Sequence, residues 1–210
     1  EATDGRVGYI YVPNMGPEGL NEFCRYYYPQ LTKEALIIDD RANGGGNVSP
    51  MLIERLLRTP YRLTMYRGSK INGTIPDGTH YGPKVLLINK YSASDGDLFP
   101  WSFKAVGLGK VIGTRSWGGI IGITSSLPYI DGTNVNVPFF TNYDAKTGSW
   151  IVENHGVDPD IYIDNDPIME YNGIDQQLNK AIEVVLEELK DRKPLPSTPA
   201  PRVLKDLGVK

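Results

Sequence analysis

Cysteine and histidine are scarce in this chain, and their scarcity excludes several kinds of site. Cys24 is the single cysteine, and His80 and His155 are the two histidines among 210 residues. One cysteine cannot form a disulfide within the chain, and Cys24 stands among aromatic residues in a helix-like stretch, as a small core residue does. Since no residues show metal-ligand spacing, we expect neither a metal site nor a cofactor.

Long apolar runs and an excess of positive charge are also missing. No apolar stretch is long enough to cross a bilayer, and the acidic residues at the N-terminus do not resemble a signal peptide. The net charge of −3 gives no general affinity for nucleic acid. The composition is that of a soluble globular protein, for which we expect neither a membrane span nor a nucleic-acid partner.

Short apolar runs alternate with helical patterns along the chain. The expected strands are residues 8–13, 35–39, 85–88 and 110–113, and the expected helices are residues 16–28, a helix capped by Ser49, and residues 178–189. Continuous apolar strands suit a sheet that helices cover on both faces. The alternation therefore predicts an α/β fold with a partly parallel sheet flanked by helices.

The remaining segments are β-rich or rich in turn residues. Further strands are expected at residues 61–66, 120–127, 126–130 and 134–140, with a loop or hairpin at 70–81 and a turn at Asp131-Gly132. Prolines recur from residue 193 onward, which predicts an extended tail. We therefore expect a single domain over residues 1–192, followed by a proline-rich tail over residues 193–210.

Two turns that follow expected strands are candidates for chemistry. Residues 43–47 contain three successive glycines, which are typical of an anion pocket but equally of a flexible turn. Ser94 stands where a strand gives way to a helix, and there its hydroxyl and the amide of Asp95 can serve acyl transfer. The alternative is that Ser94 caps the helix, with Asp95 and Asp97 complementing the helix dipole.

A serine nucleophile needs a proton acceptor, and the chain offers two histidines. His80 lies in a turn-rich loop and is typical of a solvated residue there. His155 lies in a turn close to Glu153, a carboxylate that can orient a histidine. Neither histidine is assigned as the base from its surroundings in the sequence.

Four motifs in a fixed order resemble the tail-specific (C-terminal-processing) serine protease family, in its tricorn-like branch. They are IIDDRANGGG at 37–46, YSASDGD at 91–97, GTRSWGG at 113–119 and VENHGVDPD at 152–160. The resemblance covers roughly residues 5–189. It implies a crotonase-like (Clp-type) α/β core. It also favours the interpretation that Ser94 is a nucleophile over the interpretation that Ser94 only caps the helix.

The resemblance also implies the residues of the site. The nucleophile falls on Ser94, and the oxyanion hole on the amide of Asp95 with that of Gly45 or Gly46. The turn formed by Trp117, Gly118 and Gly119 is the expected substrate-binding segment. The substrate implied is a peptide or an unfolded protein.

The proton acceptor distinguishes this chain from most of the family it resembles. Those members use a lysine in a Gly-Lys-Gly turn, but Gly119 occupies that position, and Lys104 and Lys110 lie elsewhere. The tricorn-like branch uses a Ser–His–Ser–Glu tetrad, in which the glutamate corresponds to Glu153. Its histidine comes from an upstream subdomain of the same polypeptide.

Three roles for the chain follow as hypotheses. The first is a C-terminal catalytic subdomain that is inactive without the upstream histidine. The second is a non-catalytic peptide- or ligand-binding module of the same fold, because ligand carriers also resemble this family. In the third, the tail and the helix at 178–189 contact a neighbour, which makes a homo-oligomer a candidate assembly.

Overall fold

The centre of the structure is a five-stranded sheet in which every described strand pair is parallel. The computed structural model describes residues 2–69, 72–125 and 128–200. The strand order is β1-β2-β5-β6-β9, where these strands are Val7–Tyr11, Ala35–Asp39, Lys84–Ile88, Gly109–Gly113 and Ile161–Tyr162. In register, Ile38 lies beside Ile10 on one side and Leu86 on the other. All carboxyl ends of these strands therefore meet at one edge.

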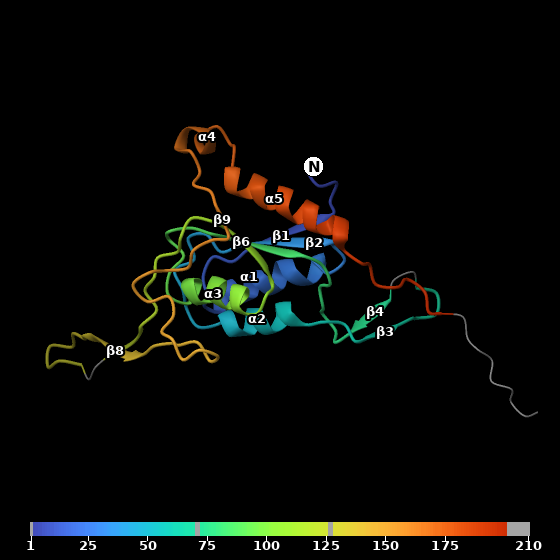
Figure 1. The fold of residues 1–210 in the computed structure, drawn as a ribbon. Helices are drawn as coiled ribbons and strands as arrows, with labels where there is room; N and C mark the ends of the chain where they lie inside the picture. The colour runs from blue at the N-terminus through green and yellow to red at the C-terminus, as the bar shows by residue number, and fades with distance from the viewer. Residues whose placement is uncertain (1, 70–71, 126–127, 201–210) are drawn as a thin grey trace, which may run out of the picture.

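Helices cover both faces of this sheet (Figure 1). One face carries α1 (Pro17–Tyr27), α2 (Ser49–Leu57) and α3 (Asp95–Ala105), and the other carries α5 (Gln176–Glu188). Along β2, Leu36 and Ile38 pack toward the first three helices, whereas Ile37 packs toward α5. Because both faces are buried, the strand is apolar throughout rather than alternating. The predicted α/β fold with a parallel sheet flanked by helices is confirmed.

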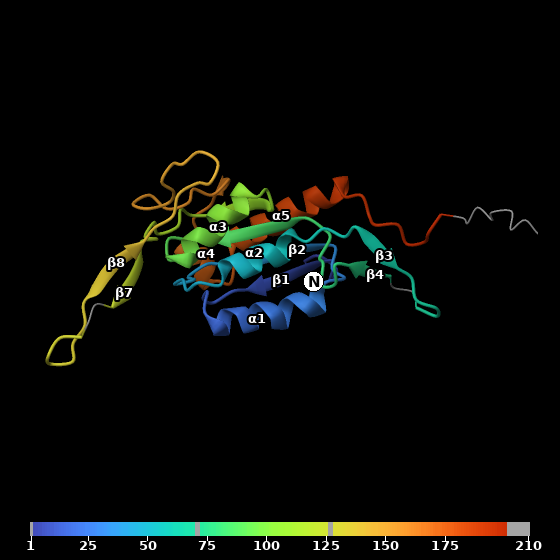
Figure 2. The ribbon, with the colours of Figure 1, turned by 90° about the horizontal axis from the view of Figure 1, so that it is seen from below.

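Two antiparallel ribbons extend from opposite ends of the body (Figure 2). One ribbon pairs β3 (Arg62–Thr64) with β4 (Gly73–Ile75), and the other pairs β7 (Gly122–Ser125) with β8 (Asn136–Phe140). The expected turn at Asp131-Gly132 is present, since the Gly132 amide donates to the Tyr129 carbonyl at 2.8 Å. The predicted strand at 126–130 is wrong for residues 128–130, which form loop and turn. Residues 70–71 and 126–127 of these predictions lie outside the described residues.

Smaller elements complete the chain. A short helix that the sequence patterns did not predict, α4 (Pro167–Tyr171), is capped by the Asp166 carboxylate, which accepts hydrogen bonds from two backbone amides. Single 3-10 turns, η1 and η2, follow α1 and α5 at Tyr28–Gln30 and Leu189–Asp191. Residues 193–200 contain no helix or strand, and the Ser197 carbonyl accepts a hydrogen bond from Asn72 in the β3–β4 loop. Among the described helices, none is both long and apolar enough to cross a bilayer.

The central strand β5 should dominate the stability of the fold. Leu86 is fully buried between β2 and β6 beneath α1–α3. We expect Leu86→Ala to lower the free energy of unfolding by about 2–5 kcal/mol, because it removes buried methyl groups and leaves a cavity. Met51 on α2 is exposed, so Met51→Ala should change stability by less than about 0.5 kcal/mol. Urea unfolding measures both, and equal effects would contradict the assignment of the core.

Candidate active site

The loops that follow β2 and β5 lie against each other at the carboxyl edge of the sheet. The two strands are neighbours, so their loops leave the sheet side by side. The Ala93 amide donates to the Asn43 carbonyl at 2.8 Å, and the Ser92 hydroxyl donates to the Asp40 carbonyl at 2.8 Å. The structure thereby brings the triple-glycine turn and the Ser94 turn together, at the edge where α/β proteins bind ligands.

Two glycines are required by the closeness of this approach. A Cβ on Gly45 would lie 2.6 Å from the Ser94 Cβ and 2.8 Å from the Ala93 carbonyl oxygen, and the Gly45 φ is +99°. A Cβ on Gly46 would lie 2.0 Å from the Met15 carbonyl oxygen, with a φ of +148°. Only glycine allows both the backbone conformation and the contact. Gly44, by contrast, has open space around it.

Ser94 occupies a strained turn at the N-terminus of α3. Its φ of 57° and ψ of −119° are a rare combination for a residue with a Cβ. The Asp97 carboxylate accepts a hydrogen bond from the Ser94 amide at 2.9 Å, and the Asp97 amide donates to the Ser94 carbonyl at 2.9 Å. A serine on a sharp strand-to-helix turn of this kind presents its hydroxyl at the edge of the sheet.

Two backbone amides without an acceptor follow the residues of this contact, one after Ser94 and one after Gly45. Within the described part of the chain, no acceptor is found for the amide of Asp95 or for that of Gly46. The Gly45 amide is engaged, because it donates to the Asn43 side-chain oxygen at 2.9 Å. The Asp95 carboxylate is also engaged, since it accepts from both the amide and the hydroxyl of Ser49. The prediction that Ser49 caps α2 is wrong. Ser49 is the first residue of α2, and the capping residue is Val48.

Two carboxylates hold four consecutive backbone amides at residues 118–121. Asp97 accepts hydrogen bonds from Gly118 at 2.8 Å and from Gly119 at 3.3 Å. Glu153 accepts from Ile120 at 2.7 Å and from Ile121 at 3.0 Å, both through Oε2. Because Asp97 also holds the Ser94 amide, this segment links Glu153 to the Ser94 turn.

The turn at residues 117–119 is shaped by an exposed indole. Trp117 is 65% exposed, and its ring lies over Gly119, where an added Cβ would come within 2.1 Å of a ring carbon. Both backbone groups of Gly118 are engaged, because its amide donates to Asp97 and its carbonyl accepts from Asn154 at 2.8 Å. The indole therefore leaves no room for a side chain at residue 119 in this conformation.

Backbone strain also surrounds Glu153. Val152 and Asn154, on either side of it, both have a φ of 63°. This region is a genuine outlier for a β-branched residue such as Val152. Such conformations cost roughly 1–3 kcal/mol each, and they persist where the surrounding contacts fix them. Here the contacts include the Asn154 bond to Gly118 and the Gly156 bond to the Val152 carbonyl.

Burial raises the pKa of acidic groups beneath the site. Burial is the largest cause that raises the pKa of Asp97, and hydrogen bonds from Ser116 and from the Gly118 amide oppose it. The pKa of Asp40 is raised well above its usual range by complete burial and by the charge of Asp39. One Asp40 oxygen accepts from the Asn43 side chain at 2.8 Å, while the other has no partner among described residues.

Among the described residues, neither histidine side chain forms a hydrogen bond to Ser94. His80 is 1% exposed, and its Nε2 lies 3.0 Å from the Lys33 carbonyl oxygen, near the start of β5 rather than its end. The expectation of a solvated loop residue is therefore wrong for His80. The exposed His155 lies in a turn, as expected, and its Nε2 pairs with the Asp158 carboxylate at 2.7 Å.

Asp97 and Asn43 are site residues whose roles the sequence patterns did not reveal. Asn43 accepts hydrogen bonds from the amides of Gly45 and Ala93, which lie in the two facing loops. Asp97 was expected only to complement the helix dipole, yet it holds three amides of two loops. The serine-x-x-acid spacing of Ser94 and Asp97 is a signal for the first of these bonds. No comparable signal points to residues 118–119, which follow 21 residues later. Metal-ligating residues do not gather in groups of three or more anywhere in the described ranges.

The glycine turn provides a matched pair of substitutions. We expect Gly45→Ala to lower the free energy of unfolding by about 1–3 kcal/mol, because the new Cβ meets Ser94 and the backbone is left-handed. Gly44→Ala should change it by less than about 0.5 kcal/mol. Urea unfolding measures both variants. A harmless Gly45→Ala would contradict the close approach of the two loops.

Asp40 should give stability a recognisable dependence on pH. Above about pH 4 the unfolded chain loses the Asp40 proton while the folded chain retains it, so stability falls as pH rises. Asp40→Asn keeps an oxygen for the Asn43 bond and removes this titration. We expect the stability of Asp40→Asn relative to the unsubstituted chain to increase between about pH 4 and about pH 7. Parallel profiles in urea unfolding would contradict the retained proton.

Known proteins resemble this chain in sequence and in fold. Peptidase family S41 matches residues 6–163. The tricorn protease of Thermoplasma volcanium is 43% identical over 92% of this chain and 18% of its own length. Tricorn protease homolog 1 of Streptomyces coelicolor is 37% identical over 91% of this chain and 18% of its own length. The chain thus spans less than a quarter of these curated relatives.

Solved structures agree with these matches. The crystal structure of the tricorn protease superimposes with a TM-score of 0.84 and 41% identity, over 90% of this chain and 18% of that one. The photosystem II D1 C-terminal processing protease shares the fold, with a TM-score of 0.55 and 19% identity over 85% of this chain and 46% of that one. The resemblance drawn from the four motifs is confirmed. This chain belongs to peptidase family S41, and within it the chain is tricorn-like.

Proposed function

We propose that this chain is the C-terminal catalytic subdomain of a serine peptidase, in which Ser94 is the nucleophile. The observation that carries the proposal is the strained Ser94 turn, packed against Gly45 beside two amides that have no acceptor. In the reaction, the Ser94 hydroxyl gives its proton to the base and attacks a peptide carbonyl. The C–N bond then breaks, the amine leaves with that proton, and an acyl-enzyme remains. Water then releases the acyl group.

The oxyanion of the tetrahedral intermediate is bound by backbone amides in this proposal. The Asp95 amide is one donor. Gly46 is preferred to Gly45 as the second donor, because the Gly45 amide already donates to Asn43. Each donor of this kind typically lowers the barrier by roughly 2.7–4 kcal/mol.

The proton acceptor is proposed to be a histidine of an upstream subdomain. Three observations support this. His80 and His155 are both engaged elsewhere, a glycine stands at residue 119 where a Ser–Lys peptidase of the family has its lysine, and the chain spans only part of its relatives. The 210-residue chain is then inactive by itself. Glu153 completes a tetrad through the second serine of that tetrad, which also lies upstream. The two amides bind Oε2 of Glu153, and Oε1 has no hydrogen-bond partner among the described residues.

The substrate is proposed to be a peptide or an unfolded protein that lies along residues 117–119. The exposed Trp117 indole provides an apolar surface, and the Trp117 amide donates to the carbonyl of Ser92, two residues before the nucleophile. Asp97 accepts hydrogen bonds from the amides of Gly118 and Gly119, so residues 117–119 form a wall of the site that is fixed before substrate arrives. A substrate backbone beside the wall places its carbonyl near Ser94.

A second candidate function is a non-catalytic peptide- or ligand-binding module. The observation that favours it is that neither histidine of the chain contacts Ser94. The unfilled amides at Asp95 and Gly46 would then bind a carboxylate or another acceptor without any reaction.

Labelling with a fluorophosphonate probe tests the proposal, because the probe reacts with activated serines. We expect no labelling of the 210-residue chain and clear labelling of a longer polypeptide that includes the upstream subdomains. Ser94→Ala in the longer polypeptide should abolish labelling, whereas Ser92→Ala is the matched control. Ser92 is buried and donates to the Asp40 carbonyl, so it is not the nucleophile proposed here.

Two outcomes would contradict the proposal in different ways. If the 210-residue chain is labelled at Ser94, the base lies within this chain and the upstream histidine is wrong. If the longer polypeptide is folded but stays unlabelled, the binding module becomes the better function. Circular dichroism of each variant establishes that it is folded.

A further inference from the structure

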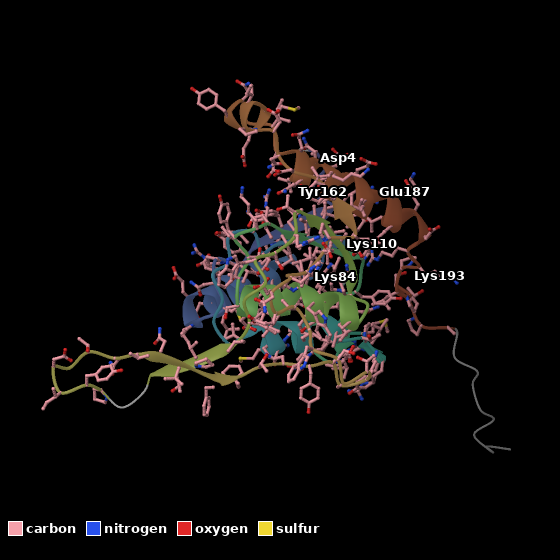
Figure 3. All side chains as sticks on the ribbon, turned by 60° about the vertical axis from the view of Figure 1, so that its left-hand side comes forward. Asp4, Lys84, Lys110, Tyr162, Glu187 and Lys193 are labelled. Carbon is pink, nitrogen blue, oxygen red and sulfur yellow. The ribbon has the colours of Figure 1, made fainter. Side chains whose placement is uncertain are left out.

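Asp97 is the third residue of α3, and its side chain contacts a loop outside the helix that carries it. Ser94 follows the end of β5, and residues 116–119 follow the end of β6, the neighbouring parallel strand. Lys84 and Lys110, which Figure 3 labels, lie at the starts of these two strands. Because the strands run side by side in the same direction, their loops leave the sheet together, and both contact the Asp97 carboxylate.

The two oxygens of the Asp97 carboxylate accept from different amides. Oδ1 accepts from Gly118 at 2.8 Å, whereas Oδ2 accepts from Ser94 at 2.9 Å and from Gly119 at 3.3 Å. The Ser94 amide and the Gly119 amide therefore share one oxygen, which joins the nucleophile turn to the wall at residues 117–119. The Ser116 hydroxyl adds a further hydrogen bond from the second loop.

A helix cap alone does not account for these contacts. An acidic residue three positions after a capping serine commonly accepts from the serine amide, and it complements the helix dipole. The bonds from Gly118 and Gly119 come from outside α3 and serve neither purpose. Moreover, Asp97 is fully buried, which a cap does not require and which is costly for a carboxylate unless hydrogen bonds compensate. The contacts are therefore specific to the meeting of the two loops.

The backbone conformation of Ser94 depends on this carboxylate. Its φ of 57° and ψ of −119° are rare for a residue with a Cβ, so the turn persists only where its surroundings fix it. The Ser94 carbonyl accepts from the amides of Asp97 at 2.9 Å and Leu98 at 3.0 Å, and the Ser94 amide donates to Asp97 Oδ2. Since the backbone sets the direction of the Cα–Cβ bond, these contacts also restrict where the Ser94 hydroxyl can lie.

We infer that Asp97 is a positioning residue of the peptidase site, which holds the Ser94 turn and the wall at residues 117–119 in one fixed relation. The inference rests on the proposed role of Ser94. Asp97 is assigned no contact with substrate or with the reacting atoms, and it acts through the backbones of the two loops. A peptide carbonyl bound along the wall then meets the Ser94 hydroxyl at a set distance, which is the geometric requirement of acyl transfer.

Amide hydrogen exchange in the 210-residue chain tests these hydrogen bonds without any reaction at Ser94. We expect Asp97→Asn to speed exchange of the three amides that Asp97 holds by about tenfold or more, because an amide side chain offers one acceptor oxygen where a carboxylate offers two. Asp160→Asn is the matched control, since Asp160 accepts from the Val111 amide at 2.8 Å, within β6. It should speed exchange at Val111 and leave the other three amides unchanged.

The fluorophosphonate probe tests the role of Asp97 in the reaction, using the longer polypeptide that includes the upstream subdomains. At saturating probe, we expect folded Asp97→Asn to be labelled about tenfold or more slowly than the unsubstituted protein, because Ser94 is no longer held in place. Asp160→Asn should leave the labelling rate unchanged. A merely structural role predicts a different pattern, in which Asp97→Asn lowers the fraction of folded protein but that fraction reacts at the original rate.

Asp97→Glu carries the test if Asp97→Asn does not fold. Glutamate is the usual residue three positions after a capping serine, so the cap and the charge at the helix N-terminus survive in this variant. Because Asp97 is fully buried, the added methylene displaces both oxygens from the amides that they now reach. The labelling rate of Asp97→Glu should therefore also fall by about tenfold or more.

Two results would overturn the inference. The first is unchanged exchange of the three amides in Asp97→Asn, and the second is a labelling rate in the folded Asp97 variant equal to that of the unsubstituted protein. If the unsubstituted longer polypeptide is not labelled, the peptidase proposal fails and the positioning role fails with it. A labelled polypeptide whose rate does not depend on Asp97 overturns the positioning role alone.

Discussion

The contact between Gly45 and Ser94 is the constraint on which the site depends. Two loops meet there at a distance that excludes even one methyl group. Adjacent parallel strands make this possible, because β2 and β5 end side by side and release their loops in the same direction. The buried packing of both sheet faces fixes the strand positions, and hence the separation of the loops. The packing of the core therefore determines how closely the two loops approach each other.

Hydrogen bonds offset the backbone strain of the turns around this contact. Ser94, Val152 and Asn154 all adopt left-handed backbone conformations. The carboxylates of Asp97 and Glu153 accept five hydrogen bonds from the amides of the same region, and these bonds hold the strained turns in place. Asp97 is fully buried, so its hydrogen bonds form in a medium of low dielectric, where they are stronger than in water. A rigid, polar frame thus surrounds a serine whose own hydroxyl lies at its edge.

Much of the fold follows from the sequence, and less of the site does. Residues 35–39 match β2, and α5 lies where the apolar repeat from Leu178 predicted it. Both were predictable because burial on one or two faces of an element produces a regular pattern of apolar residues. The pairing of β7 with β8 was misplaced, because β-rich segments do not specify their partners. Ser94 and the glycine turn came from motifs. The role of Asp97 as a link between distant loops depends on long-range contacts that leave no local pattern.

The Trp117 ring that lies over Gly119 has a consequence for how such proteins change. Ser–Lys members of the family are expected to carry a lysine at residue 119, but the indole fills the space that its first carbon needs. A lone Gly119→Lys exchange would therefore displace the indole rather than create a dyad. Residues 117 and 119 therefore constrain each other, because a side chain at residue 119 requires the indole of residue 117 to move. We expect exchanges at residue 119 to be accompanied by exchanges at residue 117.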